Sequence, residues 1–150
     1  MAGFFGGQHR DKNFVGKIIQ EIARKIKNAD TFISIGDRIW QPTWTDDLAL
    51  NSLILIGANK RGIYQMASHG TASFYELTKE IVKHLKWQDK IQIFKVPMET
   101  VNAQELSKRP ARAELSCQYI REQGLDVQRP WADALEEYLA DPYFNQFRNI

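Results

Sequence analysis

Gln41-Pro42-Thr43-Trp44-Thr45-Asp46-Asp47-Leu48-Ala49 predicts a helix that begins at Thr45. The Thr45 hydroxyl is a capping acceptor, and the carboxylates of Asp46 and Asp47 would lie at the positive end of the helix dipole. Two adjacent carboxylates could also bind a divalent metal ion, but their place at a helix start favours capping. A glycine and a short apolar run follow this helix and predict a strand over 63–67.

Helix and strand patterns alternate along the rest of the chain. The expected helices cover residues 12–27, 45–58, 74–85, 116–123 and 130–139. The expected strands cover residues 31–35, 63–67 and 91–96. This alternation favours an α/β fold with a partial sheet of about three strands and about five helices. Such a sheet is thin for so many helices, which suggests that part of the layered structure lies outside the chain.

Local signals define several of the helix ends. Asp11 is a candidate cap just ahead of the first helix, and Ser73 with Glu76 has the spacing of a capping box. Gly124 is expected to stop the short fourth helix, and Pro130 suits the first turn of the last one. These signals come from residue types and spacing alone.

Size and charge limit the class of protein. The 150 residues are enough for one domain with a buried core, so residues 1–150 are treated as a single domain. The formal net charge of +2 is too small to predict nucleic-acid binding. No apolar run approaches the roughly 20 residues needed to cross a bilayer. We therefore expect a cytoplasmic domain with neither nucleic acid nor membrane as partner.

The metal-ligating and nucleophilic side chains form no recognisable site. His9, His69 and His84 have no metal-ligand spacing with one another or with Cys117. His69 lies in a Ser-His-Gly turn and is expected to satisfy that loop. The lone cysteine is expected to be a small, partly buried apolar residue, which suits a reducing compartment. No metal site is predicted.

Five stretches, in this order and at these separations, resemble dTDP-4-dehydrorhamnose reductases of the extended short-chain dehydrogenase/reductase superfamily. They are Asn13-Phe14-Val15, residues 41–49, residues 62–76, Lys108-Arg109-Pro110 and Trp131-Ala132-Asp133-Ala134-Leu135. The resemblance runs from Phe4 to about Leu139 and matches the C-terminal, substrate-binding half of these enzymes. It implies the sugar-nucleotide lobe of a Rossmann-type reductase whose cofactor half is absent from the chain.

For the intact enzyme, the resemblance implies reduction of a dTDP-4-keto-6-deoxy sugar to dTDP-L-rhamnose with NADPH or NADH. No cofactor is expected to bind this chain, because Gly3-Phe4-Phe5-Gly6-Gly7 lacks the dinucleotide-binding spacing and no strand precedes it. Tyr75 and Lys79 have the family's catalytic spacing, but they match a downstream helix and are expected to form an ordinary surface pair. We therefore predict no catalytic residue and no activity for the chain alone, and whether it is an enzyme stays open.

The resemblance also implies which residues hold the dTDP-sugar. Asn13 matches the start of the substrate-lobe helix, and Gln41 and Thr43 match a loop beside the sugar-nucleotide cleft, where the family has glycine in place of Trp40. Arg109 and Arg112 match a region near the nucleotide pocket, and a guanidinium suits bidentate contacts with a diphosphate. For Arg109 the alternative is a surface arginine that precedes a proline.

A second interpretation is a non-catalytic regulatory or interaction subunit related to this reductase. An isolated half would expose a sheet edge and apolar surface, which a separate cofactor-binding half or self-association would cover. The aromatic tail over 143–147 is a candidate docking element, or else it packs on its own domain. The sequence leaves open whether the chain is a natural truncation, an engineered domain or a remnant, and which base and sugar it binds.

Overall fold

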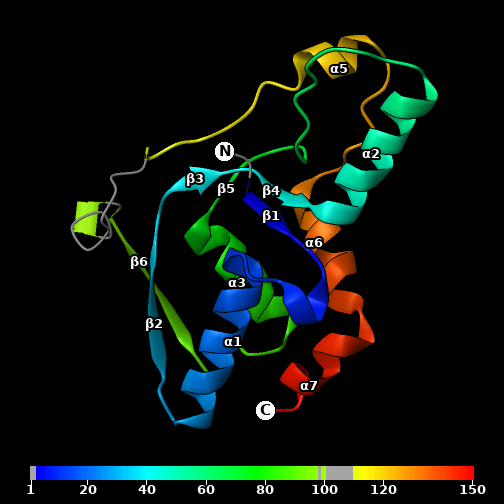
Figure 1. Ribbon diagram of the computed structural model, residues 1–150. Helices are drawn as coiled ribbons and strands as arrows, with labels where there is room; N and C mark the ends of the chain where they lie inside the picture. The colour runs from blue at the N-terminus through cyan, green and yellow to red at the C-terminus, as the bar shows by residue number, and fades with distance from the viewer. Residues whose placement is uncertain (1–2, 98, 101–109) are drawn as a thin grey trace.

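The computed structural model describes residues 3–97, 99–100 and 110–150, and its helices and strands alternate along most of the chain (Figure 1). The helices are α1 (Phe14–Lys27), α2 (Thr45–Gly57), α3 (Phe74–His84), α5 (Gln118–Glu122), α6 (Trp131–Ala140) and α7 (Asn145–Arg148), with short 3-10 turns at Gln8–Arg10 and Pro142–Phe144. The strands are β1 (Gly3–Phe5), β2 (Phe32–Gly36), β3 (Ile39–Trp40), β4 (Pro42–Trp44), β5 (Ala72–Ser73) and β6 (Gln92–Val96). The predicted α/β class is confirmed.

The described strands form three separate pairs rather than one sheet of three. The longest pair is parallel β2–β6, in register from Phe32 opposite Gln92 to Gly36 opposite Val96, which confirms the two strands predicted there. β1 pairs with β4 in parallel, and β3 pairs with β5 antiparallel. These four strands have only two or three residues each, too few to show an alternating pattern in the sequence.

The main core lies between α1, α3 and the inner face of β2–β6, and α6 packs against α3 and β4 (Figure 1). α1 presents a buried apolar stripe at helical spacing, made of Val15, Ile18, Ile19, Ile22 and Ala23. Alternate residues Ile33 and Ile35 of β2 point into the same core. Burying each large aliphatic side chain contributes about 1.5–3 kcal/mol, so this stripe carries much of the stability of the fold.

The helix α3 begins with the predicted capping box. The Ser73 hydroxyl accepts a hydrogen bond from the Glu76 backbone N–H over 3.1 Å, and a Glu76 carboxylate oxygen accepts one from the Ser73 backbone N–H over 2.7 Å. The backbone hydrogen bond from Ser73 is the main reason that the pKa of Glu76 is lowered. The reciprocal bonds fix where the chain turns into α3.

Two predicted caps are replaced by other arrangements. The cap of α2 is Trp44, whose side chain makes no capping bond, and Thr45 is already in the first turn with its hydroxyl 3.4 Å from Asp46. The formal cap of α1 is Asn13, and Asp11 acts two residues earlier by accepting a hydrogen bond from the Asn13 N–H over 2.9 Å. Asp11 is thus an acceptor of the predicted type that lies two residues before the cap, whereas the Thr45 hydroxyl donates to the Asp46 carboxylate and accepts no capping bond.

The strand predicted over 63–67 is wrong. These residues have no ladder partner among the described strands, and Ile63 is 90% exposed. An extended segment becomes a strand only when a neighbour satisfies its backbone N–H and C=O groups. The local sequence favours an extended conformation, but the described part of the chain supplies no such neighbour.

α2 is apolar on both sides. Its Leu55 joins a second small buried cluster with Ala67, Cys117 and Ile120, which links α2 to α5. The opposite face leaves Leu50, Leu53 and Ile56 between 53% and 73% exposed. Even so, none of the described helices has both the length and the apolar character required to cross a membrane.

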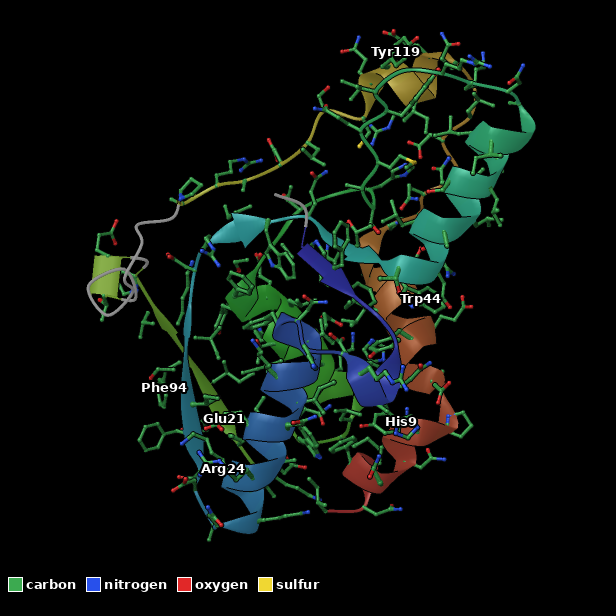
Figure 2. The ribbon with its side chains drawn as sticks, in the orientation of Figure 1. His9, Glu21, Arg24, Trp44, Phe94 and Tyr119 are labelled. Carbon is green, nitrogen blue, oxygen red and sulfur yellow. The ribbon has the colours of Figure 1, made fainter. Side chains whose placement is uncertain are left out.

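The aromatic tail is part of the core and is not a free docking element. Phe144 is 2% exposed, and its ring lies 4.9 Å from that of Tyr138. The Trp87 indole N–H donates to the Phe147 carbonyl over 2.9 Å. The rings of Tyr143 and His9 meet edge to face, and Figure 2 shows His9 beside the C-terminal helices. The burial of its aromatic rings therefore ties the tail to the domain, although the ends of a chain are often poorly ordered.

Candidate functional site

A pocket of about 480 Å³ opens at the N-terminal end of α1, where β1, β3 and the start of α3 converge (Figure 1). Its lining residues come from five segments of the chain: Gly3, Phe4, Asn13, Phe14, Arg38, Trp40, Phe74, Pro110 and Ala113. The volume falls within the range typical of small-molecule sites, and most of the lining side chains are apolar.

Three aromatic rings form one wall of this pocket. Trp40 and Phe74 are stacked, with ring centroids 4.8 Å apart and planes at 27°. Phe14 lies 4.3 Å from Phe74 and meets Trp40 edge-on at 6.2 Å. Such a wall offers π-faces and ring edges to a flat ligand ring.

The pocket also carries positive charge. The Arg38 guanidinium lies 4.7 Å from the centre of the Phe74 ring, within the range of a cation–π contact. The Arg38 carbonyl accepts a hydrogen bond from the Phe74 N–H over 3.1 Å, which ties the two residues together. Asn13 and Phe14 place the positive end of the α1 dipole at the same pocket. A flat ring and an anion can therefore be held side by side.

A buried carboxylate holds the turn that precedes α1. Asp11 is 6% exposed and accepts hydrogen bonds from the Asn13 N–H, from the Gly6 N–H over 3.3 Å and from the Tyr138 hydroxyl over 3.2 Å. A Cβ on Gly16 would lie 2.1 Å from the Asp11 carbonyl oxygen, so this approach requires glycine. The start of α1 is thereby fixed to β1 and α6.

The residues proposed from the sequence lie in three places. Asn13 is exposed at the mouth of the pocket. Gln41 and Thr43 are buried: the Gln41 side-chain oxygen accepts from the Leu115 N–H, and the Thr43 hydroxyl donates to the Gln41 carbonyl and accepts from the Ser68 N–H. Arg112 is exposed and pairs with Glu114 at 2.8 Å. Arg109 lies outside the described residues.

Sequence reasoning did not assign Arg38, Trp40 and Phe74 to the site. The first two lie in the loop over 37–43 that the resemblance placed beside the cleft. Phe74 is the first residue of α3, is only partly buried and lines the pocket. Their approach depends on the β3–β5 pairing, in which Trp40 lies opposite Ala72.

Gln41 lines a second, open and more polar hollow of about 700 Å³. This hollow also includes Thr71, Glu114, Cys117 and Arg121. Trp40 and Gln41 are adjacent, so their side chains face opposite sides of the chain and line different hollows. Burial raises the pKa of the Cys117 thiol, which favours the unreactive apolar role predicted for it.

The other candidate side chains have structural partners. His69 Nε2 lies 3.0 Å from Asp126, which also pairs with Arg121 at 3.0 Å. Burial acts to raise the pKa of Asp126, but hydrogen bonds from His69, the Gln128 N–H and Arg121 outweigh it and hold that pKa below its usual range. His69 therefore satisfies its loop, as predicted. No metal-binding cluster occurs in the described ranges.

The acidic pair at the start of α2 and the Tyr–Lys pair on α3 lie outside the 480 Å³ pocket. Asp47 is buried and accepts from Arg129 through both carboxylate oxygens, at 2.9 and 3.1 Å. Lys79 lies 5.7 Å from the ring of Tyr75 on the surface of α3. Neither pair contributes to the pocket wall.

An α/β domain with an aromatic, cationic pocket at a helix N-terminus belongs to the class of domains that can hold a small anionic ligand. Residues 1–144 match the family model for the RmlD substrate binding domain. The chain belongs to this family.

The relatives described next are longer than this chain. It is 30% identical over 131 residues to a dTDP-4-keto-6-deoxy-D-glucose reductase from Streptomyces niveus, an alignment that covers 87% of this chain and 43% of the relative. A crystal structure of a dTDP-4-dehydrorhamnose reductase from Clostridium acetobutylicum superposes with a TM-score of 0.77 at 25% identity, over 91% of this chain and 45% of that one. The enzyme from Bacillus anthracis, solved in complex with NADP, superposes with a TM-score of 0.76 at 23% identity, over 93% and 45%. The chain thus spans less than half the length of each.

Proposed function

We propose that the chain is the sugar-nucleotide-binding part of a dTDP-4-dehydrorhamnose reductase. In the intact enzyme, NADPH would reduce a dTDP-4-keto-6-deoxy sugar to dTDP-L-rhamnose, and this part would hold and orient the dTDP-sugar. The observation that carries the proposal is the pocket at the α1 N-terminus, which combines stacked aromatic rings with the Arg38 guanidinium. A nucleotide needs both, a π-face for its base and positive charge for its diphosphate.

We assign the binding roles as follows. Asn13 contacts the ligand at the pocket mouth. Gln41 and Thr43 support the wall of the pocket through their buried hydrogen bonds. Arg112 lies between two lining residues, and its exposed guanidinium is paired with the exposed Glu114, so it can turn to a diphosphate at little cost. Arg109 is the second proposed diphosphate ligand.

Calorimetric titration of the purified chain with dTDP-L-rhamnose tests this proposal, with UDP-glucose and NADPH as controls. We expect heat of binding for the dTDP ligand and none for NADPH. Asn13→Ala and Arg112→Ala should each weaken binding by roughly 0.5–1.5 kcal/mol, in the range of a single net hydrogen bond, and Lys83→Ala on the outer face of α3 should not. A cooperatively folded chain that binds no dTDP ligand contradicts the proposal.

The chain alone is proposed to be inactive, because the described residues bring no Tyr–Lys pair into the pocket. The measurement is NADPH oxidation by the purified chain in the presence of the 4-keto sugar nucleotide. Turnover above background would overturn this part of the proposal. We place the protein in the cytoplasm, where its nucleotide-sugar ligand and NADPH would be available.

We further propose that a separate cofactor-binding half covers α2 and residues 63–67. The exposed side chains Leu50, Leu53 and Ile56 form an apolar face on α2, and Ile63 in the segment that follows is 90% exposed. An exposed apolar face of this kind marks an interaction surface. A second copy of the chain is the alternative occupant.

The same face favours the second candidate function, a non-catalytic interaction subunit. The two candidates differ in ligand binding: an interaction subunit would bind a partner through α2 and leave the pocket without affinity for dTDP-L-rhamnose. Titration with dTDP-L-rhamnose therefore separates them. Leu53→Glu should abolish association in either case, and it should leave nucleotide binding unchanged if the chain is the substrate-binding part of the reductase.

A further inference from the structure

Strand β6 has one edge that no other described strand covers. It pairs with β2 alone among the described strands, and the Gln92 N–H donates to the Thr31 carbonyl over 2.8 Å. Successive residues of a strand turn their backbone groups to opposite sides, so Gln92 and Phe94 bond to β2. The N–H and C=O groups of Ile93 and Lys95 therefore point to the open edge.

A groove of about 440 Å³ lies between α3 and β6. Its lining includes Tyr75, Lys79, Val82 and Lys83, at helical spacing on α3, and Ile91 and Ile93 at the start of β6. β2 contributes no lining residue, so the groove lies at the side of β6 that faces away from β2. Val82 and Ile91 are buried and form an apolar floor. The open edge of β6 thus borders a groove that can receive side chains.

The rim of this groove is positively charged. Lys79 and Lys83 are four residues apart on α3, so they lie on the same side of the helix. Lys79 lies 5.7 Å from the centre of the Tyr75 ring and forms no ion pair within the described part of the chain. Glu80, the acidic residue of the lining, is shared between Lys83 at 3.0 Å and His84 at 3.9 Å. Positive charge therefore exceeds negative charge along the groove.

The outer face of the strand pair is aromatic. Phe32 and Phe94 are about half exposed, and their ring centroids lie 6.1 Å apart. In a strand added along β6, successive side chains would face opposite ways, one set beside Phe94 and the other over the groove. The chemistry of the two sides therefore fits a strand in which apolar and acidic residues alternate.

We propose that the open edge of β6 binds an extended acidic segment of another protein by strand addition. The backbone groups of Ile93 and Lys95 hold this segment through ladder hydrogen bonds. Its apolar side chains pack beside Phe94, and its carboxylates meet Lys79 and Lys83. The groove shares no lining residue with the 480 Å³ pocket, so this interaction goes beyond the proposed function and does not depend on it.

Charge argues against a second copy of the chain as the occupant. Two copies joined along β6 by a two-fold axis would have both α3 helices on the same side of the continuous sheet. Lys79 and Lys83 of each copy would then face those of the other across the seam, where like charges repel. An acidic segment instead supplies the opposite charge.

The probe is a labelled peptide of about eight residues, blocked at both ends, in which glutamate and valine alternate. A peptide of alternating lysine and valine is its control. We expect fluorescence anisotropy to show that the purified chain binds the acidic peptide, more weakly as salt is added, and does not bind the basic one. Binding of neither peptide, or equal binding of both, would overturn the proposal.

Lys95→Pro tests the open edge directly. The Lys95 N–H points away from β2, so proline removes a donor from the open edge and leaves the ladder with β2 intact. Compared with Lys95→Ala, which removes the same charge, it should weaken peptide binding about fivefold or more. It should leave the binding of dTDP-L-rhamnose unchanged. Equal peptide binding by the two variants would contradict strand addition.

Charge reversal on α3 tests the rim and also serves if the proline variant does not fold. Lys79→Glu combined with Lys83→Glu should weaken binding of the acidic peptide at least about tenfold. The control is Lys60→Glu with Arg61→Glu, which changes the net charge equally just after α2, far from β6 (Figure 1). Equal losses in the two double variants would reduce the effect to overall charge. A dimer of the chain that Lys95→Pro dissociates would show that a second copy occupies the edge, and either result overturns the proposal.

Discussion

The Tyr138 hydroxyl donates a hydrogen bond to Asp11 over 3.2 Å, and both side chains are buried although they lie 127 residues apart. Burial is the main cause of the raised pKa of Tyr138, and the nearby Asp11 carboxylate adds to it. The bond ties α6 to the turn that presents Asn13 at the pocket. The geometry of the pocket mouth thus depends on a residue far from it in the sequence.

Tyr138→Phe removes this bond and keeps the ring. We expect a loss of about 1–2 kcal/mol in the free energy of unfolding, because a buried charged acceptor loses one of its donors. Urea denaturation measures it. Tyr119→Phe, on the exposed side of α5 (Figure 2), is the matched control: its hydroxyl meets that of Tyr64 at the surface, and the loss of this contact should cost less than about 0.5 kcal/mol. Equal stability of the two variants would contradict a role for the buried bond.

The capping box of α3 gives a second stability prediction. Ser73→Ala should cost about 1 kcal/mol, since the Glu76 N–H loses its acceptor and the Glu76 carboxylate loses the hydroxyl that donates to it. Thermal unfolding followed by circular dichroism measures the change. Thr71→Ala, two residues earlier and outside the box, should have a smaller effect, and a larger one would show that the cap lies elsewhere.

Asp126 predicts how stability depends on pH. Its pKa is lower in the folded state than in the unfolded chain, so its ionised form stabilises the fold above the ordinary aspartate pKa of about 4. That contribution should be lost as pH falls through the ordinary value toward the lower folded value. Asp126→Asn should therefore destabilise the protein at pH 7 and much less at pH 3, measured by urea unfolding at each pH. A difference from the unaltered chain that stays constant with pH would refute this assignment.

The sequence predicts elements whose causes are local. The apolar stripe of α1 and the Ser73–Glu76 box lie within one helix or one turn, so spacing alone indicates them. The strand over 63–67 fails for the opposite reason: its residues favour an extended backbone, but a strand requires a neighbour that no local pattern can guarantee. Periodicity therefore predicts helices more reliably than it predicts which segments of this chain pair as strands.

The site is harder to predict for the same reason. The resemblance indicates the loop that contains Arg38 and Trp40, but not which of its side chains face the pocket. That depends on the two-residue ladder between β3 and β5, which brings Trp40 onto Phe74. Such a ladder is too short to leave a pattern in the sequence, so the aromatic wall emerges only in three dimensions.

The exposed face of α2 should tolerate a charged side chain without loss of stability. Leu53→Glu should leave the free energy of unfolding within about 0.5 kcal/mol of the unaltered chain, because the side chain is 66% exposed and its removal opens no cavity. It should also reduce any self-association seen by analytical ultracentrifugation. Leu55→Glu, on the buried side of the same helix, should instead unfold the chain. A marked loss of stability in the Leu53 variant would show that this face is packed within the domain.

The buried tail predicts what truncation does. Phe144→Ala should cost about 3–5 kcal/mol, since it empties a site enclosed by the rings of Tyr138, Tyr143 and Phe147. Ending the chain after Leu139 removes three of these aromatic rings and should abolish cooperative unfolding in urea. A tail that served only to dock a partner would leave the unfolding transition unchanged when deleted. Because Trp87 also donates to the Phe147 carbonyl, its fluorescence should report the loss of packing directly.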